Sequence, residues 1–458
     1  MQIKNFANIE HLTSFELTKH ANKHSRLNFS ASIAETATEN CLECAGKIIS
    51  VTTNDNTPIF FGRVEAVEVE NSFGSAEVRA SCVSLSILSD ENIKTRIFHN
   101  PDKKISEVLN RIDLESCCLQ LSKSFGELKY PRVILQNGET NFQFISRLAE
   151  NVGQKFWVVD TIQPTNIIFD SCANKSVREI KCDNIISERR MKVGKNSKAF
   201  VKLNKFFDLG QIVTLEGSVK DFVIVGIKIS LEHEKYIFLC ELEENKNSSP
   251  KISDAPISAK TVKIPAKVKN TNDPKNLGRI QVSFDNKFIE DMDEKNPLWI
   301  PWRTPYSGRN GGIVFIPDEG DRVEVFFTNE EIFCAVAFRE NPLAEECRKV
   351  AEKYIGNNSK QRIFFRERAL EFHSDKYKIL MNEQGIELTV DKNSIIMNEQ
   401  GIFFKTADSK VFLAKDAIAH VGSKIELRGS EIAVDSSGST NVKTGGTLKL
   451  AGNKIELC

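Results

Sequence analysis

Alternating apolar and polar positions dominate the C-terminal part of the chain, residues 381–457. Pairs of apolar residues separated by one residue recur there, mostly at offsets of seven or nine residues. The hexapeptide MNEQGI occurs at 381–386 and again at 397–402, and KIEL occurs at 424–427 and again at 454–457. Since alternation puts both members of a pair on one face of a strand, the pattern predicts a β repeat. The pairs are Ile386/Leu388, Ile395/Met397, Ile402/Phe404, Val411/Leu413, Ile425/Leu427, Ile432/Val434, Leu448/Leu450 and Ile455/Leu457.

Each strand of this repeat turns a thin apolar edge to one side, and one copy of so narrow a ribbon cannot bury it. A single-chain β-helix needs roughly 20 residues per coil, whereas offsets of seven to nine residues provide one strand and one turn. We therefore expect identical chains to intertwine, three being the simplest number that closes a triangular prism. A sequential β-meander within one chain is the alternative.

Short alternating segments separated by Gly and Pro fill residues 262–339. Five such strands are typical of a small closed barrel of the OB type. The segments are LGRIQVSF (277–284), PLWIPWR (297–303), GGIVFIP (311–317), DRVEVFF (321–327) and FCAVAF (333–338).

The stretch GGIVFIPDEGDRVEVFF joins the third and fourth of these segments through a Pro-Asp-Glu-Gly turn. Such a turn between two apolar strands favours a structural role in a rigid barrel. The residues expected to pack the barrel are Val314, Ile316, Val323 and Val325, and those expected to shape the turn are Pro317, Gly320 and Asp321.

Strands and a few helices are also predicted in the N-terminal half. Residues 60–88 alternate like a hairpin or meander, and residues 198–242 predict a further small β-barrel. Apolar residues at helical spacing in 101–112 predict a helix. In NFQFISRLAENVGQKFWV (141–158), a second apolar helical face is followed by an extended apolar run. Thr140, three residues before Gln143, matches a capping box at the start of that helix.

The domain boundaries follow from these patterns. Residues 1–245 are expected to form the β-barrel domains, and 246–261 a linker rich in Asn, Ser and Lys. The OB-type domain would occupy 262–339, a polar connector 340–361, and the β repeat 362–458. The chain is therefore predicted to be mainly β and modular, in keeping with its 458 residues.

Charge and composition narrow the classes of function. Lys plus Arg equals Asp plus Glu, at 62 each, so no bulk charge draws the chain to nucleic acid or anionic lipid. We expect no Sec-type signal at MQIKNFANIE, and no stretch approaches about 18 unbroken apolar residues. The eleven cysteines lack a repeating spacing, which fits a reducing cytosol.

Candidate chemistry is sparse. Cys41 and Cys44 form a C-x-x-C, but no second ligand pair accompanies them, so we expect ordinary thiols and no metal. His11, His20 and His24 are too loosely spaced to define a site and are expected to be solvated or in the core. The acidic pairs Asp318/Glu319 and Asp291/Asp293 lie in turns or polar runs without a His, Ser or Cys in a recognised order, so no enzyme activity and no cofactor is expected.

The combination of these segments resembles the VgrG-type spike proteins of type VI secretion systems and related contractile phage-tail-like machines. In that family a Gly-Arg strand precedes a Trp-containing strand and a Pro-x-x-Gly-Asp-x-Val turn, and an aromatic-rich helix with Arg-Leu-x-Glu marks the hub. The resemblance covers the chain in the family's order. It is carried by Gly278, Arg279, Trp299, Trp302, Pro317, Gly320, Asp321 and Val323, and in the helix by Phe142, Phe144, Arg147, Leu148, Glu150 and Gly153.

The resemblance implies a homotrimer in which residues 1–245 form a hub on a hexameric Hcp-like tube, the OB domain a neck, and the repeat a triple-stranded β-helical needle. It further implies baseplate partners, separately encoded effectors and a PAAR-type tip protein docked at Lys454, Ile455, Glu456, Leu457 and Cys458. The chain would be cytoplasmic in the producing cell and, after firing, extracellular or in the target cell, with membrane contact only on discharge. The 340–361 gap is too short for an inserted catalytic domain.

Two alternatives stay open. An OB module that binds nucleic acid or carbohydrate would use Trp299, Trp302, Arg303 and Tyr306 as stacking and charged groups. Extension of the repeat pairs Ile418 with His420, so three His420 side chains on an axis could hold a metal or anion. The family's metal-binding tips carry His-x-His, which is absent here, so we expect a tolerated polar position.

Overall fold

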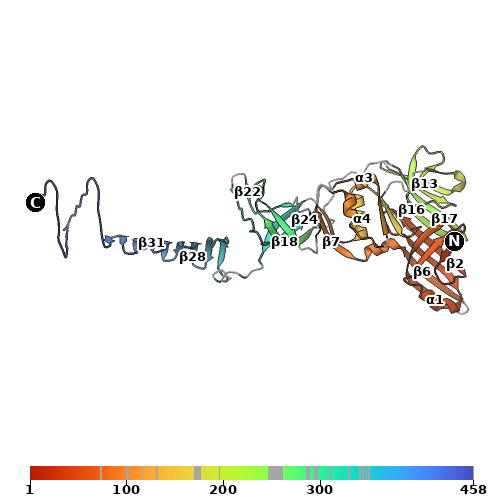
Figure 1. Cartoon of the computed structure of the whole chain (residues 1–458), viewed down its shortest axis with the longest axis horizontal. Helices are drawn as coiled ribbons and strands as arrows, with labels where there is room; N and C mark the ends of the chain where they lie inside the picture. Colours follow the sequence, from red (N-terminus) through yellow and green to blue (C-terminus); the bar gives the residue numbers. More distant parts are fainter. Residues whose placement is uncertain are drawn as a thin grey trace. The chain divides into compact units, whose positions relative to one another are not determined.

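The computed structural model describes residues 1–458 except 73–74, 100–102, 116, 130–132, 170–176, 195, 246–260, 285–288, 293–297, 309–310, 329–330, 340–341, 343–344, 346–347, 349–350 and 457–458. For residues 99, 193, 196, 289–292 and 311 it describes the backbone alone. The chain divides into two compact units, Met1–Glu340 and Asn341–Cys458, and both are built mainly from strands, as the sequence predicts (Figure 1). The expected linker lies outside the described residues except for its last position.

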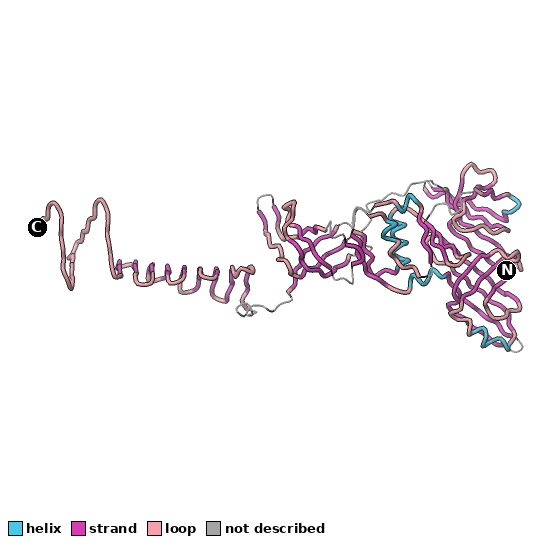
Figure 2. The backbone as a smooth tube through the Cα atoms, viewed as in Figure 1, coloured by secondary structure: helices cyan, strands magenta, loops and turns pink. Residues whose placement is uncertain are grey.

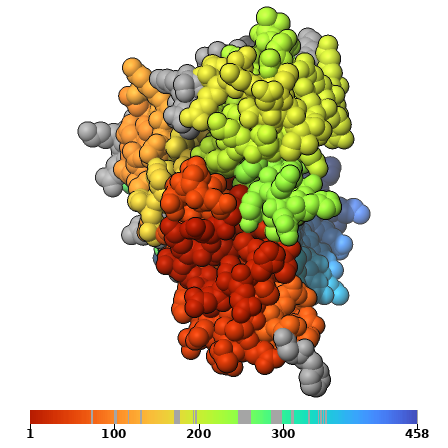
Figure 3. Space-filling model, turned by 90° about the vertical axis from the view of Figure 1, so that its right-hand side faces the viewer, coloured from red at the N-terminus to blue at the C-terminus, as the bar shows by residue number. Residues whose placement is uncertain are grey.

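A twelve-stranded sheet forms the N-terminal part of the first unit. Its main path runs β1-β4-β5-β6-β3-β2-β16-β17-β14-β13, with β15 beside β16 and β12 beside β15. Leu17 of β2 pairs with Ile229 of β16, so strands far apart in sequence share one sheet; Figure 3 shows these regions adjoining in red and in yellow to green. The strands are β1 (Gln2–Lys4), β2 (His11–His20), β3 (Arg26–Ile33), β4 (Ile48–Thr52), β5 (Pro58–Ser72), β6 (Ser75–Ser84), β12 (Arg178–Ile180), β13 (Ile185–Val193), β14 (Asn196–Leu203), β15 (Ile212–Leu215), β16 (Asp221–Glu232) and β17 (Lys235–Glu244).

Helices and short strands form a second core between β6 and β12. The helix predicted within 101–112 is the short α2, and the one predicted from residue 141 is α4. Their apolar faces share a cluster in which Phe144 and Leu148 are fully buried. The elements are η2 (Leu85–Asp90), β7 (Ile93–His99), α2 (Ile105–Leu109), β8 (Cys117–Leu121), α3 (Lys123–Gly126), β9 (Ile134–Thr140), α4 (Asn141–Asn151), β10 (Trp157–Val159) and β11 (Thr165–Phe169).

Five strands in the order β21-β19-β18-β24-β25 form the OB-type sheet of the first unit. Val323 and Val325 are buried in its core, as expected, and Ile316 packs partly against it. The first strand, β18, pairs with both β19 and β24 and so takes the central place. The strands are β18 (Val262–Asn270), β19 (Arg279–Phe284), β21 (Trp299–Pro301), β24 (Arg322–Phe327) and β25 (Ile332–Phe338).

We expected GGIVFIP to form the third strand of this barrel, and that prediction is wrong. Only Gly311–Gly312 form a strand, β23, which pairs with β22 (Ser307–Gly308) in a separate two-stranded arm. Val314, which we expected in the core, is 75 % exposed. The apolar run is held on the arm instead, because the Ile313 amide donates to the Tyr306 carbonyl at 2.9 Å.

The second unit contains a nine-stranded antiparallel meander in which each strand pairs with the next along the chain (Figure 2). Within one chain this arrangement is the sequential β-meander, the alternative to intertwined chains that the repeat pattern left open. Its first strand falls inside the expected connector. The strands are β26 (Lys353–Gly356), β27 (Arg362–Arg366), β28 (Ala369–Ser374), β29 (Tyr377–Asn382), β30 (Gly385–Val390), β31 (Asn393–Asn398), β32 (Gly401–Lys405), β33 (Lys410–Ala414) and β34 (Ala417–Val421).

Residues 422–456 contain no strand, although the repeat predicts strands there. Their apolar side chains, such as Leu427 and Val434, are exposed. A strand needs a neighbour that satisfies its backbone groups, and the described single chain offers none to this segment. Figure 2 shows the segment as the loop-coloured trace that leads to the C-terminus.

Candidate functional sites

One face of the meander is apolar on every strand from β27 to β34, and we call it the apolar face of the needle. Directly opposed residues lie on the same side of an antiparallel pair, so the register defines this face. Ile386 opposes Met397, and Phe404 opposes both Ile395 and Val411, which confirms that the predicted pairs share one side. The face consists of Ile363, Phe365, Leu370, Phe372, Ile379, Met381, Ile386, Leu388, Ile395, Met397, Ile402, Phe404, Val411, Leu413 and Ile418.

This face is open to solvent in the single chain. Phe365 is 48 % exposed and Phe404 41 % exposed, which is unusual for large apolar side chains that line up in a row. Contiguous apolar patches of this kind mark association surfaces. The face ends at His420, which opposes Val411 on the last strand.

The expected tip-docking residues lie at the end of the second unit. Lys454 and Glu456 form an ion pair, and Ile455 is exposed. Leu457 and Cys458 lie outside the described residues.

The Gly-Arg motif of the OB domain is organised by a carboxylate that the sequence pattern did not reveal. Asp273 accepts hydrogen bonds from the amides of Lys275 and Leu277 and from Nε and Nη2 of Arg279, the last at 2.6 Å. Arg279 and these amides hold the pKa of Asp273 well below its usual value. Gly278 adopts a positive φ of 69°, and the Arg279 guanidinium lies 5.8 Å from the Trp299 ring.

The Pro-x-x-Gly-Asp turn closes the loop before β24, as the pattern predicts. Pro317 is buried, and Gly320 has a φ of 92°. The Gly320 amide donates to the Val268 carbonyl, and the Val268 amide donates to the Asp321 carbonyl, so the turn is tied to β18. Asp321 Oδ2 accepts from the Asp318 amide at 3.0 Å. The Asp321 carboxylate therefore stabilises the turn.

The hub-motif helix α4 begins with the capping box that the sequence predicts. Thr140 Oγ1 accepts from the Gln143 amide, and Gln143 Oε1 accepts from the Thr140 amide. On the buried side of the helix, Phe142, Phe144 and Leu148 pack into the second core.

The polar motif residues of α4 have different surroundings. Arg147 forms a bidentate pair with Glu139 at 2.7 and 2.8 Å, and it also donates to the Leu135 carbonyl. Gly153 ends the helix with a φ of 68°. Glu150 is exposed.

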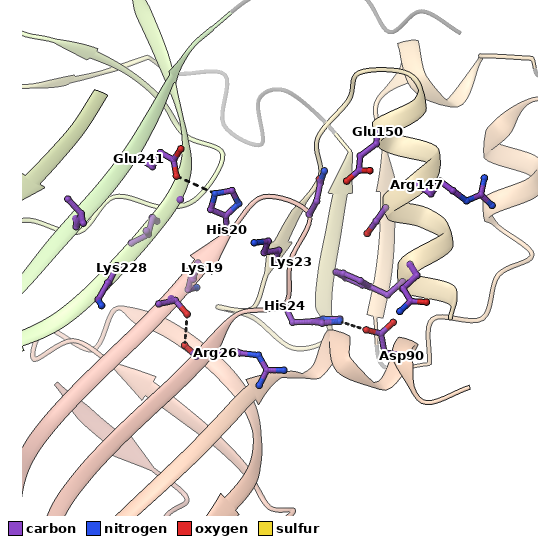
Figure 4. Close-up of a pocket in the computed structure, with 18 of the residues that line it drawn as sticks. Lys19, His20, Lys23, His24, Arg26, Asp90, Arg147, Glu150, Lys228 and Glu241 are labelled. Atoms are coloured by element: carbon purple, nitrogen blue, oxygen red, sulfur yellow. Dashed lines mark hydrogen bonds and ion pairs between the residues drawn. The ribbon is translucent and has the colours of Figure 1, made fainter. Parts of the chain in front are cut away.

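A cavity of about 780 Å³ lies between α4 and the twelve-stranded sheet, and we call it the hub pocket (Figure 4). Its walls come from the end of β2 and the following turn, from β16 and β17, and from the outer side of α4. Lining residues are Thr18, Lys19, His20, Asn22, Lys23, His24, Arg26, Asp90, Phe142, Gln143, Ser146, Arg147, Glu150, Phe200, Gly226, Ile227, Lys228, Leu239 and Glu241.

His20 and Glu241 form one wall of the hub pocket, at a distance of 3.3 Å between Nε2 and Oε2. Gly226 makes room for them, because a Cβ at that position would lie 3.0 Å from His20 Cδ2 and 3.3 Å from Glu241 Cβ. Lys19, which also lines the pocket, forms a fully buried ion pair with Asp160. Burial raises the pKa of Asp160, and the Lys19 ammonium opposes that rise.

His24 connects the turn after β2 to the start of α4. Its Nε2 lies 2.8 Å from Asp90 Oδ2, its Nδ1 lies 2.7 Å from Ser86 Oγ, and its ring stacks 3.8 Å from that of Phe142. Asp90 also accepts from Thr140 Oγ1, the helix cap. Burial alone would raise the pKa of Asp90, but the hydrogen bonds from His24 and Thr140 outweigh it and lower the pKa.

Comparison with known proteins agrees with this geometry. Residues 264–338 match the family of type VI secretion system/phage-baseplate injector OB domains. No curated protein sequence matches the chain. Among solved structures, the E. coli c3393 protein, described as a type VI secretion component similar to T4 bacteriophage tail proteins gp27 and gp5, is 13 % identical with a TM-score of 0.53; the match covers 74 % of this chain and 99 % of that one. A chain of the half-lidded Francisella PdpA-VgrG complex is 8 % identical, with a TM-score of 0.56 over 86 % of this chain and 83 % of that one. The chain has the VgrG-type fold.

Three of the four residues that the OB-binding alternative would use have partners within the domain. Arg303 lies 3.7 Å from the Phe333 ring and pairs with Glu331. Trp302 packs partly against the barrel core, and Trp299 lies beside Arg279. Tyr306 is exposed on the β22 and β23 arm. A stacking platform for nucleic acid would need several free aromatic faces, so this arrangement does not favour that alternative.

The described part of the chain holds no cluster of three or more His, Cys, Asp or Glu side chains suited to a metal. Cys41 and Cys44 are buried thiols, and Cys44 Sγ lies 3.2 Å from the Asn40 carbonyl. Among the described helices, none combines the length and apolar run needed to cross a membrane.

The sequence did not reveal the hub pocket. His20 and His24 were expected to be solvated or in the core, whereas both line the pocket with acidic partners from distant segments. Nothing in the spacing of one segment indicates Glu241, 221 residues away from His20. Only a folded sheet that joins β2 to β16 brings them together.

Proposed function

We propose that this chain assembles as a homotrimer through the apolar face of the needle and acts as a non-enzymatic spike on the inner tube of a contractile injection system. The observation that carries the proposal is the unbroken apolar face from β27 to β34 in a chain with the VgrG-type fold. Three such faces turned toward a common axis would bury their apolar rows and leave the opposite faces in water.

The same association would give strand partners to residues 422–456, near the end of the chain. Residues 422–456 keep the apolar pairs of the repeat, yet lack a strand partner in one chain. Neighbouring copies would supply those partners in an intertwined prism, where the backbone ladder has no free edge. Such a needle would resist bending under load because its strands are linked by hydrogen bonds throughout its length.

The remaining parts of the proposal rest on the resemblance to VgrG-type spikes. The hub would sit on a hexameric tube within a baseplate, a PAAR-type protein would cap the needle near Lys454, and effectors would be separate proteins. The chain would be cytoplasmic before assembly and would reach the target membrane only on discharge. Removal of residues 449–458 should abolish tip binding and leave the oligomer intact.

Solution mass tests the trimer. Light scattering of the full chain is expected to give about three times the chain mass of 51.6 kDa. The variant Ile395→Lys/Phe404→Lys places two charges opposite each other on the apolar face, and its mass should fall to that of one chain.

A matched variant provides the control. Thr389 and Ser394 are directly opposed on the other face of the same ladder, so Thr389→Lys/Ser394→Lys introduces the same charges and should keep the trimer. A monomeric full chain at all concentrations would refute the proposal. Equal dissociation of both variants would show that the apolar face is not the interface.

A further inference from the structure

The hub pocket has the dimensions and composition of a ligand site. Its volume of about 780 Å³ falls in the range of about 300–1,000 Å³ that is usual for such sites. Its apolar lining, which we call the floor, includes Leu239 of β17 and the edge of Phe142 at the start of α4. An apolar lining with a few polar groups around it favours a ligand that carries both kinds of group.

Almost every basic side chain of the pocket walls already has a carboxylate partner. The pairs are Lys19 with Asp160, His20 with Glu241, His24 with Asp90, Arg26 with Glu65, Arg147 with Glu139, and Lys228 with Glu16.

Two oppositely charged side chains on facing walls of the hub pocket have no charged partner among the described residues. Within the part of the chain that the structure describes, neither the Lys23 ammonium nor the Glu150 carboxylate forms a hydrogen bond or ion pair. Lys23 comes from the turn after β2 and Glu150 from α4. Figure 4 shows Glu150 directed from the helix toward the space in which Lys23 lies. The pocket therefore offers one positive and one negative group above an apolar floor.

We propose that the hub pocket is a docking site for a short peptide segment of a partner protein. In the segment, an acidic side chain pairs with Lys23, a basic side chain pairs with Glu150, and an apolar side chain between them packs on the floor. A peptide can carry acidic, basic and apolar side chains on one chain, which matches the three kinds of group in the pocket. This site is separate from the needle interface, so the peptide-binding test and the test of the trimer can fail independently.

Four capped pentapeptides test the charge pattern, since capping leaves only side-chain charges. They share a central leucine and carry Glu and Lys, two Glu, two Lys, or two Gln at the ends. Binding to the full chain is measured by ligand-observed NMR. The wild-type chain should prefer the mixed peptide by about two-fold to five-fold, because an ion pair with an exposed side chain contributes only modestly to binding.

Single charge reversals should then change the preference in opposite directions. Lys23→Glu leaves two acidic groups and should prefer the two-Lys peptide, whereas Glu150→Lys leaves two basic groups and should prefer the two-Glu peptide. This design does not depend on the direction in which the peptide runs. Lys235→Glu and Glu179→Lys, at exposed positions outside the pocket, should keep the wild-type preference.

Three results would overturn the proposal: equal binding of all four peptides by the wild-type chain, no exchange of preference in the pocket variants, or the same exchange in the control variants. Binding of free glutamate or lysine as strongly as the mixed peptide would also overturn it, because the site would then recognise single amino acids. Replacement of the central leucine by serine should weaken the mixed peptide, since the apolar floor would lose its contact.

Discussion

The buried ion pair of Lys19 and Asp160 gives the sharpest test of hub energetics. The two side chains are 1 % and 0 % exposed, and they join β2 to the segment that follows β10. In Lys19→Met the side-chain volume is kept but Asp160 becomes an uncompensated buried charge. The loss of one partner from a buried pair costs about 3–5 kcal/mol. For a domain of about 150–250 residues each kcal/mol lowers the melting temperature by roughly 2–4 °C, so a decrease of about 6–20 °C is expected.

A double variant separates the charge effect from packing. Lys19→Met/Asp160→Leu removes both charges and should recover most of the lost stability, because apolar replacements of buried pairs are often neutral or stabilising. Thermal unfolding of the full chain can be followed by tryptophan fluorescence, since Trp157 is buried on the strand that leads to Asp160.

The pH dependence of the single variant provides a second criterion. Burial already raises the pKa of Asp160, and loss of Lys19 raises it further above the unfolded value of about 3.9. The penalty is therefore complete at a pH above the folded pKa. It decreases as the pH falls through that pKa, because a neutral carboxyl needs no counter-charge. A loss below about 1 kcal/mol, or a double variant as unstable as the single one, would refute the reasoning.

Two further predictions concern the OB domain and the needle. Asp273→Asn should lower the melting temperature of the full chain at neutral pH. Since the folded pKa of Asp273 is depressed, its contribution to stability is complete above the unfolded pKa of about 4 and is lost progressively as the pH falls from there toward the folded pKa, so the difference between variant and wild type should shrink over that range. Gly401→Ala should destabilise the pairing of β32 with β33 by more than about 1 kcal/mol, because φ is 145° and the new Cβ would lie 2.1 Å from the Leu413 carbonyl oxygen; faster proteolysis of the needle would reveal it, and Gly445→Ala, which has no atom within 4 Å, is the control.

The parts of the structure that the sequence predicts well are those set by local patterns. The register of β30 to β33 follows from period-two alternation, because a slip of one residue would move Ile395 and Phe404 to the opposite side. The start of α4 follows from Thr140 and Gln143, whose hydrogen bonds depend only on neighbours in sequence.

Other features depend on contacts that local patterns do not encode. The run from Ile313 to Phe315 is continuously apolar, like a buried strand, yet it lies on an exposed arm, and β18 occupies the central place in the barrel. Periodicity cannot distinguish an apolar surface segment from a core strand. The hub pocket likewise depends on long-range pairing, since Lys23 and Glu150 are brought to facing walls only by the complete fold.

The number of strands in the meander of the second unit determines the length of its ladder. Adjacent strands are about 4.8 Å apart, so the nine strands extend about 38 Å along the ladder. Because MNEQGI recurs after 16 residues, removal of residues 385–400 would bring Ile402 opposite Met381 in place of Ile386, with the apolar face still in register. The ladder would become shorter by two strands, or about 10 Å. Gain or loss of such repeats can therefore set reach in discrete steps while every remaining contact is preserved.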